Sequence, residues 1–194
     1  MARNTIEGME ATRKSLLDAA RALFAQQGYA DTATPDIVAL AKVTRGALYH
    51  HFADKRALFL AMAEREAARV AEETEARAAP ASSPREALLK GASAYFDAMA
   101  AEGRTRLLLV EAPAVLGGEA TDAVDAEHAE RSLRLGLADL LAGSGRESLL
   151  EPLTTLMSAA FDRASVAIEA GGNRKDYEAA IAALIDGLGT GFSR

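Results

Sequence analysis

The 194-residue sequence contains no cysteine and no tryptophan, and aromatic residues make up only 5% of it. Without cysteine, disulfide bonds and thiolate metal sites are both excluded. The chain also lacks a signal-peptide pattern and any run of about 20 apolar residues that could cross a bilayer. We therefore expect a cytoplasmic protein that has no membrane partner.

Catalytic chemistry finds little support in the sequence. Catalysis needs acid, base or nucleophilic groups that converge, and two of the three histidines are the adjacent pair His50 and His51. Neighbouring residues on a helix diverge by about 100°, so this pair cannot converge on one metal ion. We therefore expect no enzyme activity, no metal site and no cofactor.

The residues that are present favour helices. Hydrophobic residues make up 49% and charged residues 26% of the chain, which is an ordinary composition with enough apolar material for a core. Alanine is abundant while aromatic residues are scarce, and this balance favours helix over sheet. The sequence therefore predicts an all-α fold.

The net charge of −6 is unevenly distributed along the chain. Residues 1–60 hold eight Lys and Arg against six Asp and Glu, a balance of +2, whereas the remainder holds fourteen against twenty-two, a balance of −8. A basic N-terminal part on an acidic C-terminal part fits a chain that presents its first sixty residues to an anion such as DNA.

Residues 34–55 contain three predicted helix starts. Thr34, followed by Pro35 at the first helical position, is one candidate cap, and Thr44 and Asp54 are the others. The buried faces of the first two helices are predicted to consist of Ile37, Val38, Leu40 and Ala41, and of Leu48 and Phe52. Two short helices joined by such a turn form a helix-turn-helix, whose second helix presents its N-terminal end to the DNA major groove.

This stretch resembles the DNA-binding domain of TetR-family transcriptional regulators. The residues that carry the resemblance are Gly28, Tyr29, Thr32, Asp36, Ile37, Val43, Thr44, Arg45, Gly46, Leu48, Tyr49, His51, Phe52, Lys55 and Leu58. The sequence departs from the family pattern at Ala33, where a hydroxyl residue is usual, at Val38, where a small residue is usual, and at Lys42, where glycine is usual. A left-handed backbone at Lys42 would cost about 1 kcal/mol.

The second helix of the motif carries the candidate contacts to bases. Arg45, Gly46, Tyr49 and His50 lie opposite Leu48 and Phe52 on a helical wheel. Arg45 can donate to O6 and N7 of guanine, while Thr44, Tyr49 and Lys55 suit phosphate. For His51 a structural role is the favoured interpretation. The predicted DNA-binding residues are Thr34, Thr44, Arg45, Gly46, Tyr49, His50 and Lys55.

The resemblance implies a DNA-binding domain over residues 1–60, with a flexible arm over residues 1–10, and a ligand-binding and dimerisation domain over residues 61–194. Hydrophobic spacing and punctuation predict helices over residues 12–27, 54–77, 84–99, 107–110, 122–142, 152–170 and 174–188, a linker over residues 78–83 and a kinked loop over residues 111–118. Ser83 and Glu86 form a predicted capping box, and Pro113 is predicted to break the short apolar helix before it.

The last two predicted helices carry apolar stripes joined by Gly171 and Gly172. Two such hairpins from two chains would form a four-helix bundle, which is the homodimer that the family resemblance implies; the stripes could instead fill a core within one chain. The predicted interface residues are Leu153, Met157, Ala160, Ala164, Ile168, Tyr177, Ile181, Leu184 and Leu188. A two-fold dimer reads two half-sites about 34–36 Å or a multiple apart, so the expected partner DNA is an inverted repeat.

The functional prediction is a repressor that a small apolar or amphipathic effector releases from a palindromic operator. Candidate effector-binding residues in the C-terminal part are Tyr95, Phe96, Met99, Glu111, His128 and Phe161, although for each of them taken singly a core role is the favoured interpretation. Activation instead of repression stays open at this stage. The alternative function is a helical protein–protein adaptor that does not bind DNA.

Overall fold

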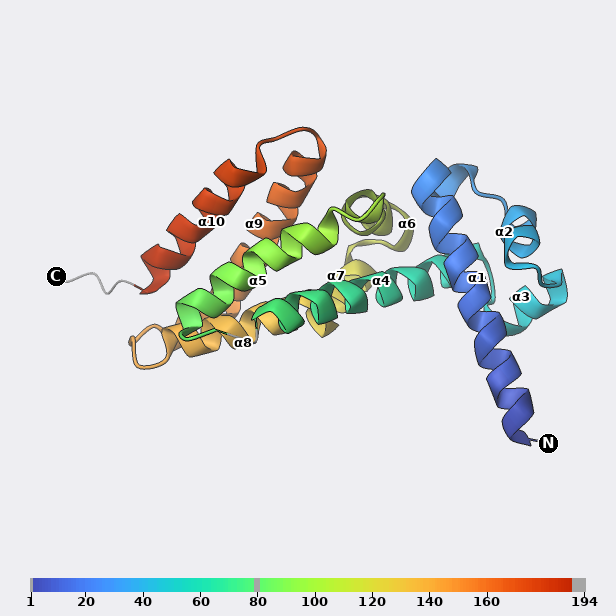
Figure 1. Ribbon diagram of the computed structural model, residues 1–194, viewed down its shortest axis with the longest axis horizontal. Helices are drawn as coiled ribbons and strands as arrows, with labels where there is room; N and C mark the ends of the chain where they lie inside the picture. The colour runs from blue at the N-terminus through green and yellow to red at the C-terminus, as the bar shows by residue number, and fades with distance from the viewer. Residues whose placement is uncertain (1, 79–80, 190–194) are drawn as a thin grey trace. The chain divides into compact units, whose positions relative to one another are not determined.

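The computed structural model describes residues 2–78 and 81–189, and within these ranges it consists of helices and connecting segments without a strand (Figure 1). The all-α prediction is confirmed. The chain forms two compact units: residues 1–66 with 106–121, which we call the head, and residues 67–105 with 122–194, which we call the body. None of the helices in the described ranges is both long and apolar enough to traverse a bilayer.

The head is built around a core of apolar side chains from six helical elements. Its elements are α1 (Ala2–Asp31), α2 (Thr34–Ala41), α3 (Arg45–His51), the first part of α4 (Lys55–Ala78), the π-helix η1 (Arg106–Glu111) and α6 (Ala112–Leu116). The fully buried residues Leu16, Phe24, Ile37, Leu48 and Phe59 belong to one cluster. The ring of Phe59 packs edge-on against Phe24 and Tyr29, with centroids 5.1 and 5.0 Å away, a favourable aromatic geometry.

Helix α1 differs from its prediction at both ends. Residues 2–10, predicted to form a flexible arm, are helical; their flexibility stays a prediction. At the other end Gly28 has a φ of 86°, a conformation that favours glycine, but one further helical turn follows it to Asp31. A Cβ at Gly28 would lie 3.0 Å from the Oε1 atom of Glu111, so that carboxylate would have to shift by a few tenths of an ångström.

The kinked end of α1 frees backbone groups that charged side chains satisfy. The N–H of Tyr29 donates to Oε2 of Glu111 at 2.9 Å, and Arg106 donates to the carbonyls of Phe24 and Ala25 at 2.8 Å each. Glu111 also pairs with Arg106 at 3.2 Å. Residues 106–111 are therefore joined to α1 by polar contacts as well as by the shared core.

The segment after α5 is helical where the sequence predicts a break. The predictions that Pro113 ends a short helix and that residues 111–118 form a kinked loop are wrong, because η1 runs directly into α6 with Pro113 in its first turn. A proline ring normally clashes with the carbonyl four residues earlier. The wider π-helical turns of η1 lie at that position and change the backbone register, which offers a physical reason for the continuity. Arg56 then donates to the carbonyls of Val115 and Leu116, at 3.3 and 2.7 Å.

The body consists of the end of α4, α5 (Pro84–Met99), α7 (Gly118–Glu127, from residue 122 on), α8 (Ala129–Leu141), a 3-10 turn η2 (Glu147–Leu149), α9 (Leu150–Glu169) and α10 (Arg174–Gly189). Its core contains Leu88, Ala92, Phe96, Leu137, Met157, Phe161, Ala164, Ile181 and Ile185. The predicted helices over residues 84–99, 152–170 and 174–188 are confirmed to within two residues. The predicted linker includes residues 79 and 80, which lie outside the described residues.

The predicted capping box at the start of α5 is half confirmed. Ser83 caps α5 as predicted, since its Oγ accepts a hydrogen bond from the N–H of Glu86 at 3.2 Å. The carboxylate of Glu86, however, accepts from the N–H of Ser82 at 2.8 Å instead of from that of Ser83.

The prediction of a single helix over residues 122–142 is wrong. The helix is interrupted at His128, where φ is −118° and ψ is −94°. No glycine or proline marks this break in the sequence. The two helices differ in their packing, because the apolar stripe of α8 packs into the core of the body whereas α7 has no buried residue.

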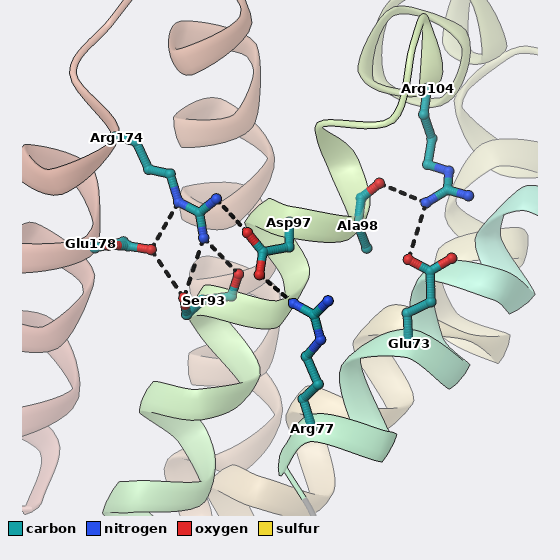
Figure 2. A network of polar contacts seen from close by, with 8 residues as sticks. All are labelled: Glu73, Arg77, Ser93, Asp97, Ala98, Arg104, Arg174 and Glu178. Carbon is teal, nitrogen blue, oxygen red and sulfur yellow. Dashed lines mark hydrogen bonds and ion pairs between the residues drawn. The ribbon is translucent and has the colours of Figure 1, made fainter.

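Charged side chains tie the end of α4 to α5 and α10 (Figure 2). Asp97 of α5 accepts from both Arg77 of α4 and Arg174 of α10, and hydrogen bonding from Arg174 holds its pKa below the usual range. Arg104, which is buried, donates to the carbonyl of Ala98 at 2.6 Å and pairs with Glu73 of α4 at 3.4 Å. These contacts position residues 73–77 of α4 within the body.

Candidate functional site

Two of the three helix starts predicted within residues 34–55 have the predicted N-cap. Oγ1 of Thr44 accepts from the N–H of Ala47 at 3.1 Å, and Oδ1 of Asp54 accepts from the N–H of Ala57 at 2.7 Å. The predicted cap at Thr34 is wrong by one residue: the N-cap is Ala33, with extended φ and ψ and no side-chain bond. Thr34 is the first residue of α2 and is partly buried.

Lys42 has the left-handed backbone that the family pattern predicts, with φ 55° and ψ 40°. Its N–H donates to the carbonyl of Ala39 at 3.2 Å, and the N–H of Val43 donates to the carbonyl of Val38 at 3.2 Å. These bonds close α2 and start the turn. A lysine tolerates this conformation at a cost of about 1 kcal/mol relative to glycine.

The outward face of α3 is formed by Arg45, Gly46, Tyr49 and His50, all exposed, while Leu48 beneath them is fully buried. The Arg45 guanidinium lies 5.5 Å from the centroid of the Tyr49 ring, and within the described ranges it has no hydrogen-bonded or ion-paired partner. A Cβ at Gly46 would meet only Thr44 Oγ1 at 3.8 Å, an ordinary contact. The fold of the head itself therefore does not require glycine there, and the Arg45 donors are free.

His51 differs from His50 in its surroundings. It is partly buried, and burial, followed by the nearby charges of His50 and Arg13, lowers its pKa below 6.5. Its ring packs 6.2 Å from the ring of Phe52, centroid to centroid. This environment agrees with the structural role favoured for His51.

Lys55, predicted to contact phosphate, has partners inside the head. Its ammonium donates to the carbonyls of Tyr29 and Thr32, at 2.8 and 3.0 Å, and lies 4.1 Å from the centroid of the Tyr29 ring. Both carbonyls lie at the end of α1 and lack helical partners of their own. Two of the three ammonium donors are thus occupied, and a phosphate contact by Lys55 stays a prediction.

The body contains a cavity of about 660 Å³. Its walls come from the end of α4, from α5, from α8 and from α9, and they include Thr74, Leu88, Tyr95, Leu133, Ser158, Phe161 and Asp162. All lining residues belong to the body unit. A cavity of this size suits a drug-sized molecule.

The structure brings two of the six candidate effector residues to this cavity. Tyr95 and Phe161 line it, with ring centroids 5.5 Å apart. Phe96 and Met99 are buried in the body outside the lining, and His128 lies at the break between α7 and α8. Glu111 belongs to the head, where its carboxylate is engaged by Tyr29 and Arg106.

Sequence reasoning missed the polar side of the cavity. The Tyr95 hydroxyl donates to Oδ1 of Asp162 at 2.7 Å, and the Ser158 hydroxyl donates to Oδ2 of Asp125 at 3.0 Å. Burial, together with the negative charges of Asp125 and Glu130, raises the pKa of Asp162 to about 6, and the Tyr95 bond offsets only part of this. Burial likewise raises the pKa of Asp125. The one available signal was the i, i+4 spacing of Ser158 and Asp162 beside Phe161.

We expect Asp162→Asn to stabilise the protein at pH 7. The pKa of Asp162 in the folded state, about 6, lies above the usual 3.8. As the pH falls, the folded state therefore binds the proton at a higher pH than the unfolded state does. The ionised carboxylate destabilises the folded state to its full extent only above pH 6. Linkage sets this penalty at about 3 kcal/mol at most, and asparagine retains the acceptor for Tyr95. Urea unfolding at pH 7 and pH 5 should show a gain of about 1–3 kcal/mol at pH 7 and a smaller gain at pH 5.

The exposed carboxyl Asp176 on α10 supplies the matched control, because Asp176→Asn removes the same charge outside the cavity. If Asp162→Asn and the parent protein have the same free energy of unfolding at pH 7, the partly buried Asp162 carboxylate does not destabilise the folded state, and the prediction is wrong.

The candidate dimer residues divide between the core and the surface of the body. Met157, Ala164 and Ile181 are buried within one chain, whereas the Leu184 side chain is 49% exposed. The partly buried members are Leu153, Ala160, Ile168, Tyr177 and Leu188. Parts of both stripes therefore serve the intrachain core. Leu156, Ala159, Ala183 and Leu184 leave an exposed apolar strip on α9 and α10.

Comparison with known proteins relates both parts of the chain to one family. The family description "Bacterial regulatory proteins, tetR family" matches residues 16–62, and "Tetracyclin repressor-like, C-terminal domain" matches residues 85–192. The HTH-type transcriptional regulator AcrR of Shigella flexneri is 49% identical over 59 residues, which span 30% of this chain and 27% of AcrR. The alignment to this curated relative thus covers less than a third of its length.

Solved structures extend the likeness to nearly the whole chain. A TetR-family transcriptional regulator from Pectobacterium atrosepticum is 32% identical, with a TM-score of 0.73 over 94% of each chain. The regulator FadR of Bacillus subtilis, solved with stearoyl-CoA, has a TM-score of 0.73 over 92% of this chain and 98% of its own, but at 16% identity it shows the fold alone. Since the C-terminal match covers more than half of the sequence, the chain belongs to the TetR family of bacterial regulatory proteins.

Proposed function

We propose that this protein is a sequence-specific DNA-binding transcriptional regulator, a repressor that a small-molecule effector releases from a palindromic operator. One observation carries the proposal: α3 exposes Arg45, Tyr49 and His50 on one face, with the Arg45 donors unoccupied, while Leu48 anchors the opposite face in the core. An unpaired guanidinium at the N-terminal end of such a helix matches the donor pattern that guanine accepts in the major groove.

The remaining residues of this face have complementary roles in the proposal. Gly46, which the head itself does not require to be glycine, lets the backbone approach the DNA closely. Thr44 and Tyr49 donate to phosphates, which fixes the register of α3 on the duplex, and His50 reads a base edge. Thr34, at the start of α2, contacts the DNA backbone beside the major groove. Lys55 acts chiefly by holding the end of α1 in place through its hydrogen bonds to the carbonyls of Tyr29 and Thr32.

Dimerisation completes the DNA-binding unit. One recognition helix buries too little surface for tight, specific binding, so two copies are needed. The exposed strip on α9 and α10, which includes Leu156 and Leu184, is the surface proposed to pair with a second copy. A two-fold dimer of this kind would read an inverted repeat with half-sites about 34–36 Å or a multiple apart.

The cavity in the body is proposed as the effector site. Residues 71–78 of α4 contribute to its wall, and the same helix begins at Lys55 in the head, so a ligand that displaces the end of α4 acts on a continuous helix. The effector must bind two conformations unequally. A hundredfold loss of operator affinity requires about 3 kcal/mol of coupling between the two sites.

Selection from random double-stranded DNA with the purified protein tests the function. We expect an inverted repeat, bound by a dimer. Leu184→Glu should place a charge in the dimer surface, give a monomer by light scattering and lose the preference for paired half-sites. Leu149→Glu, at a residue of η2 that is 46% exposed and outside the proposed interface, is the matched control and should behave like the parent.

Two outcomes would count against the proposal. Enrichment of no sequence, together with an absence of salt-dependent DNA binding, would favour the protein–protein adaptor instead. A parent protein that stays monomeric at micromolar concentration would exclude the paired half-sites.

A further inference from the structure

We infer that the effector of this protein is an organic cation, namely a protonated amine attached to an apolar, aromatic-sized body. The inference rests on the proposed function, because it takes the cavity of the body as the effector site, and it adds the chemical class of the molecule. Its basis is an excess of carboxylates around an apolar cavity, of which two are partly buried and form no ion pair with Lys or Arg among the described residues.

Carboxylates reach the cavity from three of the four helices that form its walls. Glu75 lies on α4, Asp139 on α8 and Asp162 on α9, while Arg131 is the one basic residue of the described lining. Arg131, Glu75 and Asp139 are all exposed, so water screens their charges, and the partly buried Asp162 is the lining carboxylate that acts most strongly on a ligand. A fourth carboxylate, Asp125 of α7, lies directly behind the lining residue Ser158. The cavity is therefore suited to a positive charge.

Within the described residues Asp162 and Asp125 each accept a hydrogen bond from a hydroxyl group, and the nearby His128 offsets a small part of the raised pKa of Asp125. Asp162 accepts from Tyr95 at 2.7 Å and Asp125 from Ser158 at 3.0 Å, and in the described part of the chain neither carboxylate forms an ion pair with Lys or Arg. A partly buried carboxylate without a cation carries a desolvation penalty, and neighbouring carboxylates add repulsion. An ammonium group in the cavity would remove both costs, whereas a ligand carboxylate or phosphate would increase them.

The apolar part of the cavity wall indicates what kind of ligand body carries the positive charge. The rings of Tyr95 and Phe161 line the cavity with their centroids 5.5 Å apart, and Leu88 and Leu133 extend the apolar surface. Aromatic rings favour cations as well as apolar groups. Oγ1 of Thr74 also lines this cavity and is buried without a hydrogen-bond partner among the described residues, so it can serve a polar group on the ligand.

Three dyes that share one fluorophore test the inference on the full-length protein. Dansylcadaverine carries a primary ammonium, its N-acetyl derivative is neutral, and dansyl-aminohexanoic acid carries a carboxylate at the corresponding position. Fluorescence enhancement on titration reports binding. We expect the amine to bind about tenfold or more tightly than the neutral dye and the acid to bind most weakly.

Variants identify the carboxylate responsible. Asp162→Asn should weaken the amine about tenfold and change the neutral dye by less than about twofold. Asp125→Asn provides an independent second variant with a smaller effect in the same direction, because Ser158 separates it from the cavity. Asp176→Asn, an exposed carboxylate of α10 outside the lining, should leave all three dyes unchanged. Thermal unfolding of each variant confirms that it is folded.

The results separate this inference from the proposed function. If the amine fails to bind, or binds no better than the neutral dye or the acid, while the parent protein still selects an operator, the cationic class is wrong and the regulator stands. If Asp162→Asn binds the amine as tightly as the parent does, the cavity assignment is also wrong. Loss of operator selection in the parent protein would instead overturn the proposed function.

Discussion

Replacement of Arg45 by alanine is expected to weaken operator binding about 5- to 150-fold, which corresponds to about 1–3 kcal/mol, and to relax the base preference at one position in each half-site. The reason is the free guanidinium: Arg45 lies 5.5 Å from the Tyr49 ring and has no polar partner within the described head. Its removal therefore costs the head little stability while it removes a bidentate donor to guanine.

Operator binding should be measured by fluorescence anisotropy on the selected site and on its single-base variants. Lys175→Ala, which removes a positive charge from an exposed position of α10 outside the cavity lining, is the control and should leave the base preference unchanged. An Arg45→Ala protein that discriminates among the base variants as the parent does would remove Arg45 from the reading face.

The second large effect is expected at Lys55, and it is an effect on stability. Lys55→Ala leaves the carbonyls of Tyr29 and Thr32 without their donor and removes the ammonium from the Tyr29 ring. Hydrogen bonds from a charged donor contribute about 1.5–3 kcal/mol, and solvent near this partly exposed group reduces that value, so we expect a loss of about 2 kcal/mol. Urea unfolding of the parent and the variant measures it.

The salt dependence of DNA binding distinguishes this role from a phosphate contact. If Lys55 only holds the end of α1, the folded variant should retain the salt slope of the parent. If Lys55 also contacts phosphate through its third donor, the slope should fall by about one unit in addition to the loss of stability. Arg45→Ala, which should not change stability, serves as the comparison for the unfolding measurement.

Much of the helix-turn-helix, as well as the start of α5, could be predicted from the sequence because the signals are local. Thr44, Asp54 and Ser83 cap the helices that follow them through hydrogen bonds to residues three positions ahead. The left-handed backbone of Lys42 and the outward face of α3 follow equally from short-range patterns. Each of these features requires only that a residue type stands at a given distance from its neighbours.

The cavity and the role of Lys55 could not be predicted in this way. Phe96, Met99, Tyr95 and Phe161 share the same aromatic or thioether character and helical spacing, yet only two of them line the cavity. Asp162 resembles any charged residue on an amphipathic helix until Tyr95, 67 residues away, donates to it. Burial and charge at these positions depend on which helices pack together.

The sequence by itself determined the class of fold, the positions of most helices and the residues that α3 exposes, because periodicity and capping act over a few residues. Tertiary structure decided the rest. Glu111 binds the backbone of Tyr29 across 82 residues, which makes residues 106–121 part of the head, and the break at His128 follows no local signal. Such features depend on long-range packing and on the unpaired backbone groups that it exposes or satisfies, and no local pattern in the sequence records these.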